Sequence, residues 1–241
     1  MNKESYKRTI LITGAASGIG LAIAQKFDEG DVRLILNSHS PISNKDLNKF
    51  HHKPINLVFD VTDEKAIKDA FDNNLPAHQK IDVLINSAGT NIDKLFVQMT
   101  EIEFKQVLET NFNGTANVID TVLPYLKSGS MIINMASVIG LSGNIGQANY
   151  AASKDALLVL TKYLAMQYAS QGVLVNAVSP GMINTKMTDA MSEKMKKYAE
   201  SIIPLKRFGK PNEVAELVEA LSNMTYVTGQ NFVVDGGLYM S

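Results

Sequence analysis

Short apolar runs alternate along this chain with longer helical patterns, and this alternation constrains the fold more than any other feature. The apolar runs are rich in β-branched residues and predict strands at 9–13, 32–36, 55–59, 82–86, 131–135, 173–178 and 231–235. The helical patterns predict helices at 18–29, 43–50, 63–73, 99–127, 150–171 and 211–222. Several of the strands are apolar almost throughout, as in sheets that are covered on both faces. The sequence therefore predicts an α/β fold, with a doubly wound parallel sheet of about seven strands flanked by helices on both faces.

Two expected helix starts and one long gap complete this outline. Thr62 and Pro211 stand where helix N-termini are expected, because threonine caps a first turn and proline suits the first helical position. No repeat, low-complexity segment or linker interrupts the chain, so one domain over 1–241 is expected. Residues 181–210 form one long irregular stretch rich in Met and Lys, which predicts a lid or binding loop.

The composition excludes several classes of function. The 241 residues carry a formal net charge of −1 and no long basic run, which argues against nucleic acid and anionic membranes as partners. Cysteine is absent, so disulfides, thiol catalysis and thiolate metal sites are excluded. His39, His51, His52 and His78 show no ligand spacing with carboxylates, so no catalytic metal is expected. The chain lacks the apolar core of a signal peptide and any run long enough to span a membrane, so a cytoplasmic protein is expected.

The first predicted strand runs into the glycine-rich stretch "TGAASGIG". Gly14, Gly18 and Gly20 follow this strand and open the first helix. Such a loop can turn tightly, let its backbone approach a pyrophosphate and aim a helix N-terminus at the negative charge. The spacing is G-x-x-x-G-x-G rather than G-x-G-x-x-G. Its place at the first strand–helix junction favours a nucleotide site over a loop that only turns.

A tyrosine and a lysine stand four residues apart in "YAASK". Tyr150 and Lys154 fall in a predicted helix, so their side chains lie on one face, one turn apart. Taken alone, the pair is more often a packed tyrosine and a solvated lysine than a functional site.

These motifs, with others between them, resemble the short-chain dehydrogenase/reductase family in order and over nearly the whole chain. The other matching stretches are "DVTD" (60–63), "NSAG" (86–89), "TNFNG" (110–114), "NMASVIG" (134–140) and "SPGMINTKM" (179–187). In "NSAG", Ser87 replaces the second asparagine of the family's N-N-A-G. The resemblance implies one NAD(P)-binding domain of the Rossmann type.

The resemblance also implies a set of cofactor-binding residues. Asp60 and the Val61 backbone would approach the adenine, and the Ile183 backbone and the Thr185 hydroxyl would approach the nicotinamide carboxamide. The full set is Gly14, Ser17, Gly18, Ile19, Gly20, Ser38, His39, Asp60, Val61, Asn86, Ala88, Gly89, Tyr150, Lys154, Pro180, Gly181, Ile183 and Thr185.

The catalytic residues that the family pattern implies are Asn111, Ser137, Tyr150 and Lys154. Reduction of a ketone leaves charge on the carbonyl oxygen, so a proton donor is needed there. A tyrosine titrates at about 10 in water, and the nearby lysine and an oxidised nicotinamide are expected to lower that pKa. Lys154 would also hold the nicotinamide ribose, Ser137 would bond the substrate oxygen, and Asn111 would hold a water linked to Lys154.

The end of the second strand, "LILNSHS", bears on cofactor choice. No carboxylate stands near Ser38 and His39 to bind the ribose 2′-hydroxyl of NAD or to repel the 2′-phosphate of NADP, which favours NADP. Against NADP, Ser17 occupies a position where many NADP-preferring members of the family carry a basic residue.

The substrate class follows from resemblance within the family. The stretches 137–154, 204–215 and 227–240 look similar to the 3-oxoacyl-[acyl-carrier-protein] reductases of fatty-acid synthesis, which reduce a 3-oxoacyl thioester with NADPH. Dehydrogenases of small ketones, secondary alcohols and sugar alcohols share parts of these stretches and remain an alternative. A cofactor-sensing binding module without turnover is an alternative of another class.

The resemblance implies two kinds of macromolecular partner. An acidic acyl carrier protein would need basic residues near the cleft, but 123–130 holds only Lys127, and Gln171 stands where a basic residue is expected. Lys206, Arg207 and Lys210 are the remaining candidates. The predicted helix 150–171 has small and apolar residues on more than one face, and with 99–127 and the C-terminus it resembles the interfaces of a homotetramer.

Overall fold

The strands of this protein form one parallel sheet. The computed structural model describes residues 6–76, 78–189 and 191–240. Its seven-stranded sheet has the order β3-β2-β1-β4-β5-β6-β7, and every neighbouring pair is parallel. The strands are β1 (Arg8–Ile12), β2 (Val32–Ser38), β3 (Ile55–Val58), β4 (Val83–Asn86), β5 (Met131–Met135), β6 (Leu174–Pro180) and β7 (Asn231–Val234). The predicted α/β fold and each predicted strand are confirmed.

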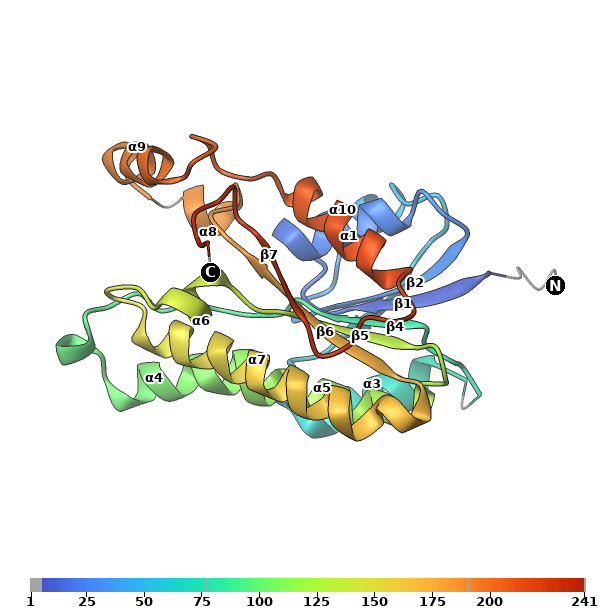
Figure 1. Ribbon diagram of the computed structural model, residues 1–241. Helices are drawn as coiled ribbons and strands as arrows, with labels where there is room; N and C mark the ends of the chain where they lie inside the picture. Colours follow the sequence, from blue (N-terminus) through green and yellow to red (C-terminus); the bar gives the residue numbers. More distant parts are fainter. Residues whose placement is uncertain (1–5, 77, 190, 241) are drawn as a thin grey trace.

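Helices cover both faces of the sheet (Figure 1). The α-helices are α1 (Gly18–Phe27), α2 (Asn44–Leu47), α3 (Glu64–Asn74), α4 (Glu101–Leu108), α5 (Gly114–Val122), α6 (Val138–Ser142), α7 (Ala148–Tyr168), α8 (Lys186–Asp189), α9 (Glu193–Ile202) and α10 (Pro211–Ser222). Short 3₁₀ turns are η1 (Phe96–Gln98), η3 (Leu123–Tyr125) and η4 (Ala169–Gln171), and η2 (Glu109–Asn113) is a π-helical turn. Figure 1 shows α1 and α10 on one side of the sheet and α3, α5 and α7 on the other.

Each face of the sheet has its own core because successive strand residues point to opposite sides. Ile10 and Ile12 of β1 pack with the residues of α1 and α10. Leu11, between them, packs with residues of α3, α5 and α7. All three side chains are fully buried. A strand buried on both faces reads as a continuous apolar run, which explains why these strands could be recognised in the sequence.

Three sequence predictions about helices differ from the structure. Thr62 does not cap α3, because it donates from its backbone and its hydroxyl to Asp60 Oδ1, at 2.9 and 2.8 Å. Asp63 caps the helix instead and accepts from the Ala66 backbone N–H at 2.9 Å. The predicted helix 99–127 is broken by η2 between α4 and α5. Pro211 is confirmed as the first residue of α10.

The stretch 181–210 is the third difference, since it is not irregular throughout. It contains α8 and the ten-residue α9. Ser192 caps α9 by accepting from the Met195 backbone N–H at 3.3 Å, which is the helix-start signal that the sequence interpretation missed. Ala190, inside this stretch, lies outside the described residues.

Two searches of the described ranges give negative results. No helix in them is long and apolar enough to cross a membrane. No group of three or more His, Cys, Asp or Glu residues there could hold a metal ion.

Candidate active site

The sequence-predicted site residues gather at the carboxyl edge of the sheet, where the strands end. The glycine loop follows β1, residues 38–39 lie at and just after the end of β2, 60–61 follow β3, and 86–89 lie at and after the end of β4. Ser137 follows β5, and 180–185 begin at the end of β6. The chain reverses direction across the sheet between β1 and β4, and ligands of open α/β sheets bind in the crevice at such a switch point.

The glycine loop fits a group that must approach the backbone closely. Gly14 has a φ of +67°, and a Cβ atom there would lie 2.8 Å from the Ala88 backbone. A Cβ atom on Gly20 would lie 2.5 Å from the Gly14 carbonyl oxygen. Side chains at these positions would therefore push the loop away from α1 and from the end of β4. The glycines keep the α1 N-terminus open at the crevice, as pyrophosphate binding requires.

Thr13 ties the glycine loop to the segment after β4. Its hydroxyl oxygen accepts from the backbone N–H groups of Ser87 and Ala88, at 3.0 and 3.1 Å. Because only the Ser87 backbone is used here, serine can replace the family's second asparagine without losing the contact. The sequence interpretation did not single out Thr13, although its place directly before the first glycine is a usable signal.

Asn86 points into the sheet. It is buried, and its Nδ2 donates to Asn134 Oδ1 on β5 at 2.9 Å. Ala88 is partly exposed and Gly89 is exposed, so these two residues border the crevice. Of the predicted 86–89 set, Asn86 thus links two strands, while Ala88 and Gly89 offer backbone to a ligand.

Asp60 and His39 meet although they come from different strand ends. His39 Nε2 lies 3.6 Å from Asp60 Oδ2, and both side chains are partly or largely exposed. Asp60 Oδ1 is occupied by Thr62. Val61 is buried against Gly114, where a Cβ atom would lie 2.5 Å from Val61 Cγ2. The turn is therefore anchored by Val61 and presents the Asp60 carboxylate to the solvent side.

The Ser38 hydroxyl is not free to meet a ligand. Ser38 is buried, and its Oγ donates to the Ser40 carbonyl oxygen at 2.6 Å. His39 and Ser40 are exposed in the same turn. The polar groups that stand open after β2 are thus those of His39 and Ser40, one and two residues beyond the predicted position.

Lys154 is a buried cation beside Tyr150. It is 5% exposed, and its Nζ donates to the Met135 carbonyl oxygen at 2.7 Å. The same Nζ lies 5.6 Å from the centroid of the Tyr150 ring. Burial lowers the pKa of Lys154 to about 8. The Met135 contact was missed because a backbone carbonyl leaves no trace in residue type.

The pKa of the Tyr150 phenol is raised in the protein without a cofactor. Tyr150 keeps part of its surface exposed, yet burial of the phenol raises its pKa. A hydrogen bond with Ser137 works against this rise, and the negative charge of Asp93 adds to it. In the protein alone, desolvation thus outweighs the favourable contacts, and the lowering expected with an oxidised nicotinamide bound stays a prediction.

Asn111 lies inside the π-helical turn η2 and is fully buried. Its Oδ1 accepts from the Thr90 backbone N–H at 2.7 Å. Its Nδ2 donates to the Thr90 carbonyl and to Ser153 Oγ, both at 2.9 Å. Both amide hydrogens of the side chain are therefore used. The backbone carbonyl of Asn111 accepts from Thr115 Oγ1 at 2.8 Å, and both it and Oδ1 are oxygens with a second lone pair that suits a water.

Ser137 and Gly89 complete the site. Ser137 caps α6, and its Oγ accepts from the Ile139 backbone N–H at 3.2 Å. A Cβ atom on Gly89 would lie 3.2 Å from Asn111 Oδ1 and 3.5 Å from Lys154 Nζ. The ends of β4 and β5, the turn η2 and the first turns of α7 thus converge on one place.

The segment after β6 bends over the glycine loop. Gly181 donates from its backbone N–H to the Val234 carbonyl at 3.0 Å, which keeps the segment beside β7 after Pro180 ends β6. Ile183 is buried and pairs with Gly209. The Thr185 side chain lies 3.7 Å from where a Cβ atom on Gly18 would stand.

Lys127 lies at the other edge of the sheet. Its Nζ pairs with Asp82 Oδ1 at 2.7 Å. Asp82 directly precedes β4, and Lys127 lies in the loop before β5. Gln171, in η4 before β6, shares that amino edge. Neither residue joins the site residues within one chain.

Comparison with known proteins agrees with this arrangement. A family model described as Enoyl-(Acyl carrier protein) reductase matches residues 14–239. The 3-oxoacyl-[acyl-carrier-protein] reductase FabG of Thermotoga maritima is 41% identical, over 96% of this chain and 97% of that protein. That of Aquifex aeolicus is 37% identical, over 95% and 96%.

Solved structures give the same result. A short-chain dehydrogenase/reductase from Brucella melitensis, titled glucose/ribitol dehydrogenase, superposes with a TM-score of 0.87 at 31% identity, over 100% of both chains. A 3-oxoacyl-[acyl-carrier protein] reductase from Brucella melitensis gives a TM-score of 0.90 at 30% identity, over 98% of this chain and 92% of that one. The chain therefore belongs to the short-chain dehydrogenase/reductase family. As a member it is an oxidoreductase that uses NAD(P) on a small substrate.

Proposed function

We propose that this protein reduces a 3-oxoacyl thioester to the 3-hydroxyacyl form with NADPH, with Tyr150 as the proton donor. The observation that carries the proposal is the buried Lys154 ammonium, 2.7 Å from the Met135 carbonyl and 5.6 Å from the centroid of the Tyr150 ring. A buried cation is costly and persists where a nearby group needs its charge. The similarity to FabG proteins over nearly the full length supports the 3-oxoacyl substrate.

Four side chains divide the chemistry. A nicotinamide cofactor held at the carboxyl edge would supply the hydride for the carbonyl carbon. Tyr150 gives its phenolic proton to the carbonyl oxygen, and the Ser137 hydroxyl donates a second hydrogen bond to that oxygen. Lys154 stabilises the resulting phenolate and offers donors to the nicotinamide ribose. Asn111 fixes η2 against Thr90 and Ser153, so that its carbonyl is placed for a water that returns a proton.

We propose further that the chain is one NAD(P)-binding domain that prefers NADP to NAD. The glycine loop with Gly14, Gly18 and Gly20, called here the glycine cradle, supports binding of the pyrophosphate. Asp60 with the Val61 backbone supports binding of the adenine. Residues 37–40 hold no carboxylate, which supports NADP. His39 and Ser40 fit a 2′-phosphate better than Ser38, because the Ser38 hydroxyl is bonded to the backbone. Asp60, 3.6 Å from His39, places a carboxylate near this turn and so acts against NADP.

A carrier-bound substrate is less well supported than a thioester as such. Arg207 is paired with both carboxylate oxygens of Glu213, at 2.9 and 2.6 Å, which compensates much of its charge. Lys206 Nζ donates to the Ser201 carbonyl at 2.6 Å. Lys210 is exposed beside them. Because Arg207 and Lys206 are already bonded within the chain, a dehydrogenase of a small ketone or sugar alcohol is the second candidate.

We also propose a homotetramer with two-fold axes. Exposed apolar side chains lie before and at the start of α4, on α7, and around β7. They are Phe96, Val97 and Ile102 in the first place, Val159, Tyr163 and Met166 in the second, and Met224, Tyr226, Val233 and Met240 in the third. Exposed apolar surfaces of this kind mark interaction sites.

A substrate panel tests the proposed function. NADPH oxidation is measured with a 3-oxoacyl group on acyl carrier protein, on coenzyme A and as a free ester. A carrier-bound substrate is supported if wild type has a lower KM for the carrier-bound form than for the other two. The double variant Lys206→Glu with Arg207→Glu should then raise that KM and leave the KM for the free ester unchanged. Equal kcat/KM for all three forms favours the small-ketone dehydrogenase. Tight NADPH binding with no turnover of any carbonyl substrate means a binding module instead.

A further inference from the structure

The end of α7 that carries Tyr150 lacks an ordinary cap. Gln147 is the N-cap residue of α7, and its side chain makes no capping hydrogen bond. The first backbone N–H groups of a helix have no partner inside the helix. Tyr150 is the third residue of α7, so its N–H is one of these groups. Asn149 supplies the missing acceptor, because its Oδ1 accepts from the Tyr150 N–H at 2.7 Å.

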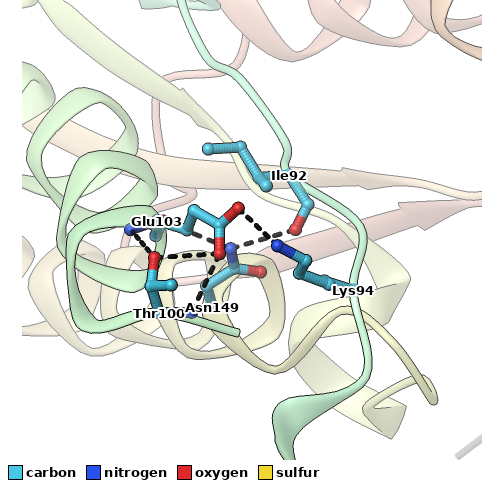
Figure 2. A network of polar contacts seen from close by, with 5 residues as sticks. All are labelled: Ile92, Lys94, Thr100, Glu103 and Asn149. Atoms are coloured by element: carbon cyan, nitrogen blue, oxygen red, sulfur yellow. Dashed lines mark hydrogen bonds and ion pairs between the residues drawn. The ribbon is translucent and has the colours of Figure 1, made fainter. Parts of the chain in front are cut away.

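The same Asn149 side chain reaches two other segments. It is fully buried, and its Nδ2 donates to the Ile92 carbonyl at 3.1 Å and approaches the Glu103 carbonyl of α4 at 3.5 Å. Figure 2 shows Asn149 between Ile92 and Glu103. One amide thus joins the first turn of α7 to the loop after β4 and to α4.

Further bonds fasten the loop 91–94 to the residues before α7. The Lys94 backbone N–H donates to the Gly146 carbonyl at 2.7 Å. Gln147 Nε2 donates to Asp93 Oδ1 at 3.0 Å. Lys94 Nζ pairs with Glu103 Oε1 at 2.8 Å, and Glu103 Oε2 accepts from Thr100 at 2.8 and 2.9 Å (Figure 2). Asn149 is fully buried, so bulk water does not replace its hydrogen bonds to Ile92 and Tyr150 when the side chain is removed.

The other proposed catalytic side chains have hydrogen bonds that do not include Asn149 itself, although Ser153, which holds Asn111, also donates to the Tyr150 carbonyl at 2.8 Å. Lys154 is held by the Met135 carbonyl, Asn111 by Thr90 and Ser153, and Ser137 by its place at the start of α6. We propose that Asn149 is the positioning residue for Tyr150, and that its clamp fixes the first turn of α7 so that the phenol meets the substrate oxygen. This inference rests on the proposed role of Tyr150. A displacement of about 1 Å at a reacting group can cost 10²-fold in rate.

Asn149→Ala tests the clamp, and Asn176→Ala is the matched control. Asn176 on β6 is equally buried, and it also bridges two backbone groups, the Val227 carbonyl at 2.8 Å and the Gln230 N–H at 3.0 Å. Both variants lose a buried amide and are expected to lower Tm. At a temperature where both are folded, we expect kcat for a free 3-oxo ester to fall roughly 10-fold or more in Asn149→Ala only. The dissociation constant for NADPH should stay within about 2-fold of wild type, since the glycine cradle is untouched.

Two further measurements keep the test decisive. Asn149→Asp keeps the acceptor for the Tyr150 N–H and suits a helix N-terminus, but it turns an oxygen toward the Ile92 carbonyl. It should fold even if Asn149→Ala does not, and it should lower kcat at least about 3-fold for the same reason. Amide hydrogen exchange should accelerate at 90–95 and 149–153 in the Asn149 variants but not in Asn176→Ala.

The outcomes separate this inference from the proposed function. If the Asn149 variants match Asn176→Ala in kcat and in exchange at 90–95, the clamp has no positioning role. If wild type turns over no carbonyl substrate, the proposed function fails, while exchange still decides whether Asn149 clamps the loop.

Discussion

The two edges of the sheet treat polar side chains in different ways. At the carboxyl edge, Lys154 and Asn111 are buried, and glycines occupy positions where a Cβ atom would collide with backbone. At the amino edge, Lys127 pairs with Asp82 while remaining half exposed, and Arg8 bonds the Ser222 carbonyl at the end of α10. The Lys127 and Arg8 side chains at the amino edge therefore stay near water, whereas Lys154 and Asn111 at the carboxyl edge are taken out of it.

This difference separates residues that stabilise the fold from residues that reserve a site. Exposed ion pairs contribute little and cost little. A buried cation lowers stability, and a position where any Cβ atom would clash restricts the sequence to glycine. Each therefore needs a functional reason to be present. The comparison predicts that changes at the carboxyl edge alter activity more than stability, and that changes at the amino edge do the reverse.

The largest effect is expected from Tyr150→Phe. The ring still packs, but the proton donor is lost, so kcat should fall by about 10²-fold or more. NADPH affinity, measured by fluorescence titration, should remain near wild type because the glycine cradle is unchanged. Retention of more than about a tenth of wild-type kcat, well above the effect of a lost acid, would falsify the assignment.

A pair of glycine substitutions compares the two edges directly. Gly14 and Gly129 both have positive φ, +67° and +88°. A Cβ atom on Gly14 would lie 2.8 Å from the Ala88 backbone, whereas a Cβ atom on Gly129 would have nothing within 4 Å. Gly14→Ala should raise the NADPH dissociation constant roughly 10-fold or more, since the loop must move away from Ala88. Gly129→Ala, in open space at the amino edge, should cost about 1 kcal/mol of stability and leave the dissociation constant unchanged. Calorimetry on both variants checks this, and equal effects on binding would remove the distinction.

Lys154→Met should abolish activity and yet stabilise the protein at pH 7. The fall in the Lys154 pKa from 10.5 to about 8 corresponds to roughly 3 kcal/mol of unfavourable burial, and loss of the Met135 contact offsets about 1–2 kcal/mol of it. A net gain of about 1–2 kcal/mol is expected in denaturant unfolding.

The pH dependence of wild type follows from the same shift. Below pH 8 both states carry the Lys154 proton, so the full burial cost applies. Between pH 8 and 10.5 the unfolded state binds more protons than the folded state, so the contribution of Lys154 to stability rises with pH. The stability advantage of Lys154→Met should therefore shrink over that range, and an advantage that grows with pH would contradict the burial argument.

The smallest effect is expected from Lys127→Met at the amino edge. Its partly exposed pair with Asp82 should contribute less than about 1 kcal/mol, so Tm falls only slightly and kcat is unchanged. If KM for a carrier-bound substrate rises nonetheless, the amino edge of one subunit must serve a neighbouring subunit's site in the assembly.

The sequence predicted the strands and the places of the site residues because both depend on residue type. Runs such as "TILIT" can be recognised from their side chains, and parallel strands then bring their following loops to one edge. Lys127 could have been assigned to the other edge by the same rule, since it precedes β5.

The rest of the site depends on contacts that residue type does not encode. The Met135 carbonyl holds Lys154, but any residue could offer a carbonyl there. The Ser38 hydroxyl is a plausible phosphate ligand in the sequence, yet it bonds Ser40 in the structure. The sign of the Tyr150 pKa shift depends on how closely the fold encloses the phenol, which no local pattern states.

The π-helical turn η2 determines what a one-residue deletion would do to this protein. A π-helical turn holds one residue more than an α-helical turn, so Glu109–Asn113 amounts to a single inserted residue within a helix. Deleting one residue there would remove the wide turn and join α4 to α5 as one regular helix, because the extra residue is accommodated within that turn. The sheet would survive such a deletion, but Asn111 could no longer face both Thr90 and Ser153. A descendant that lost one codon from this helix would be expected to keep the architecture and lose the catalyst.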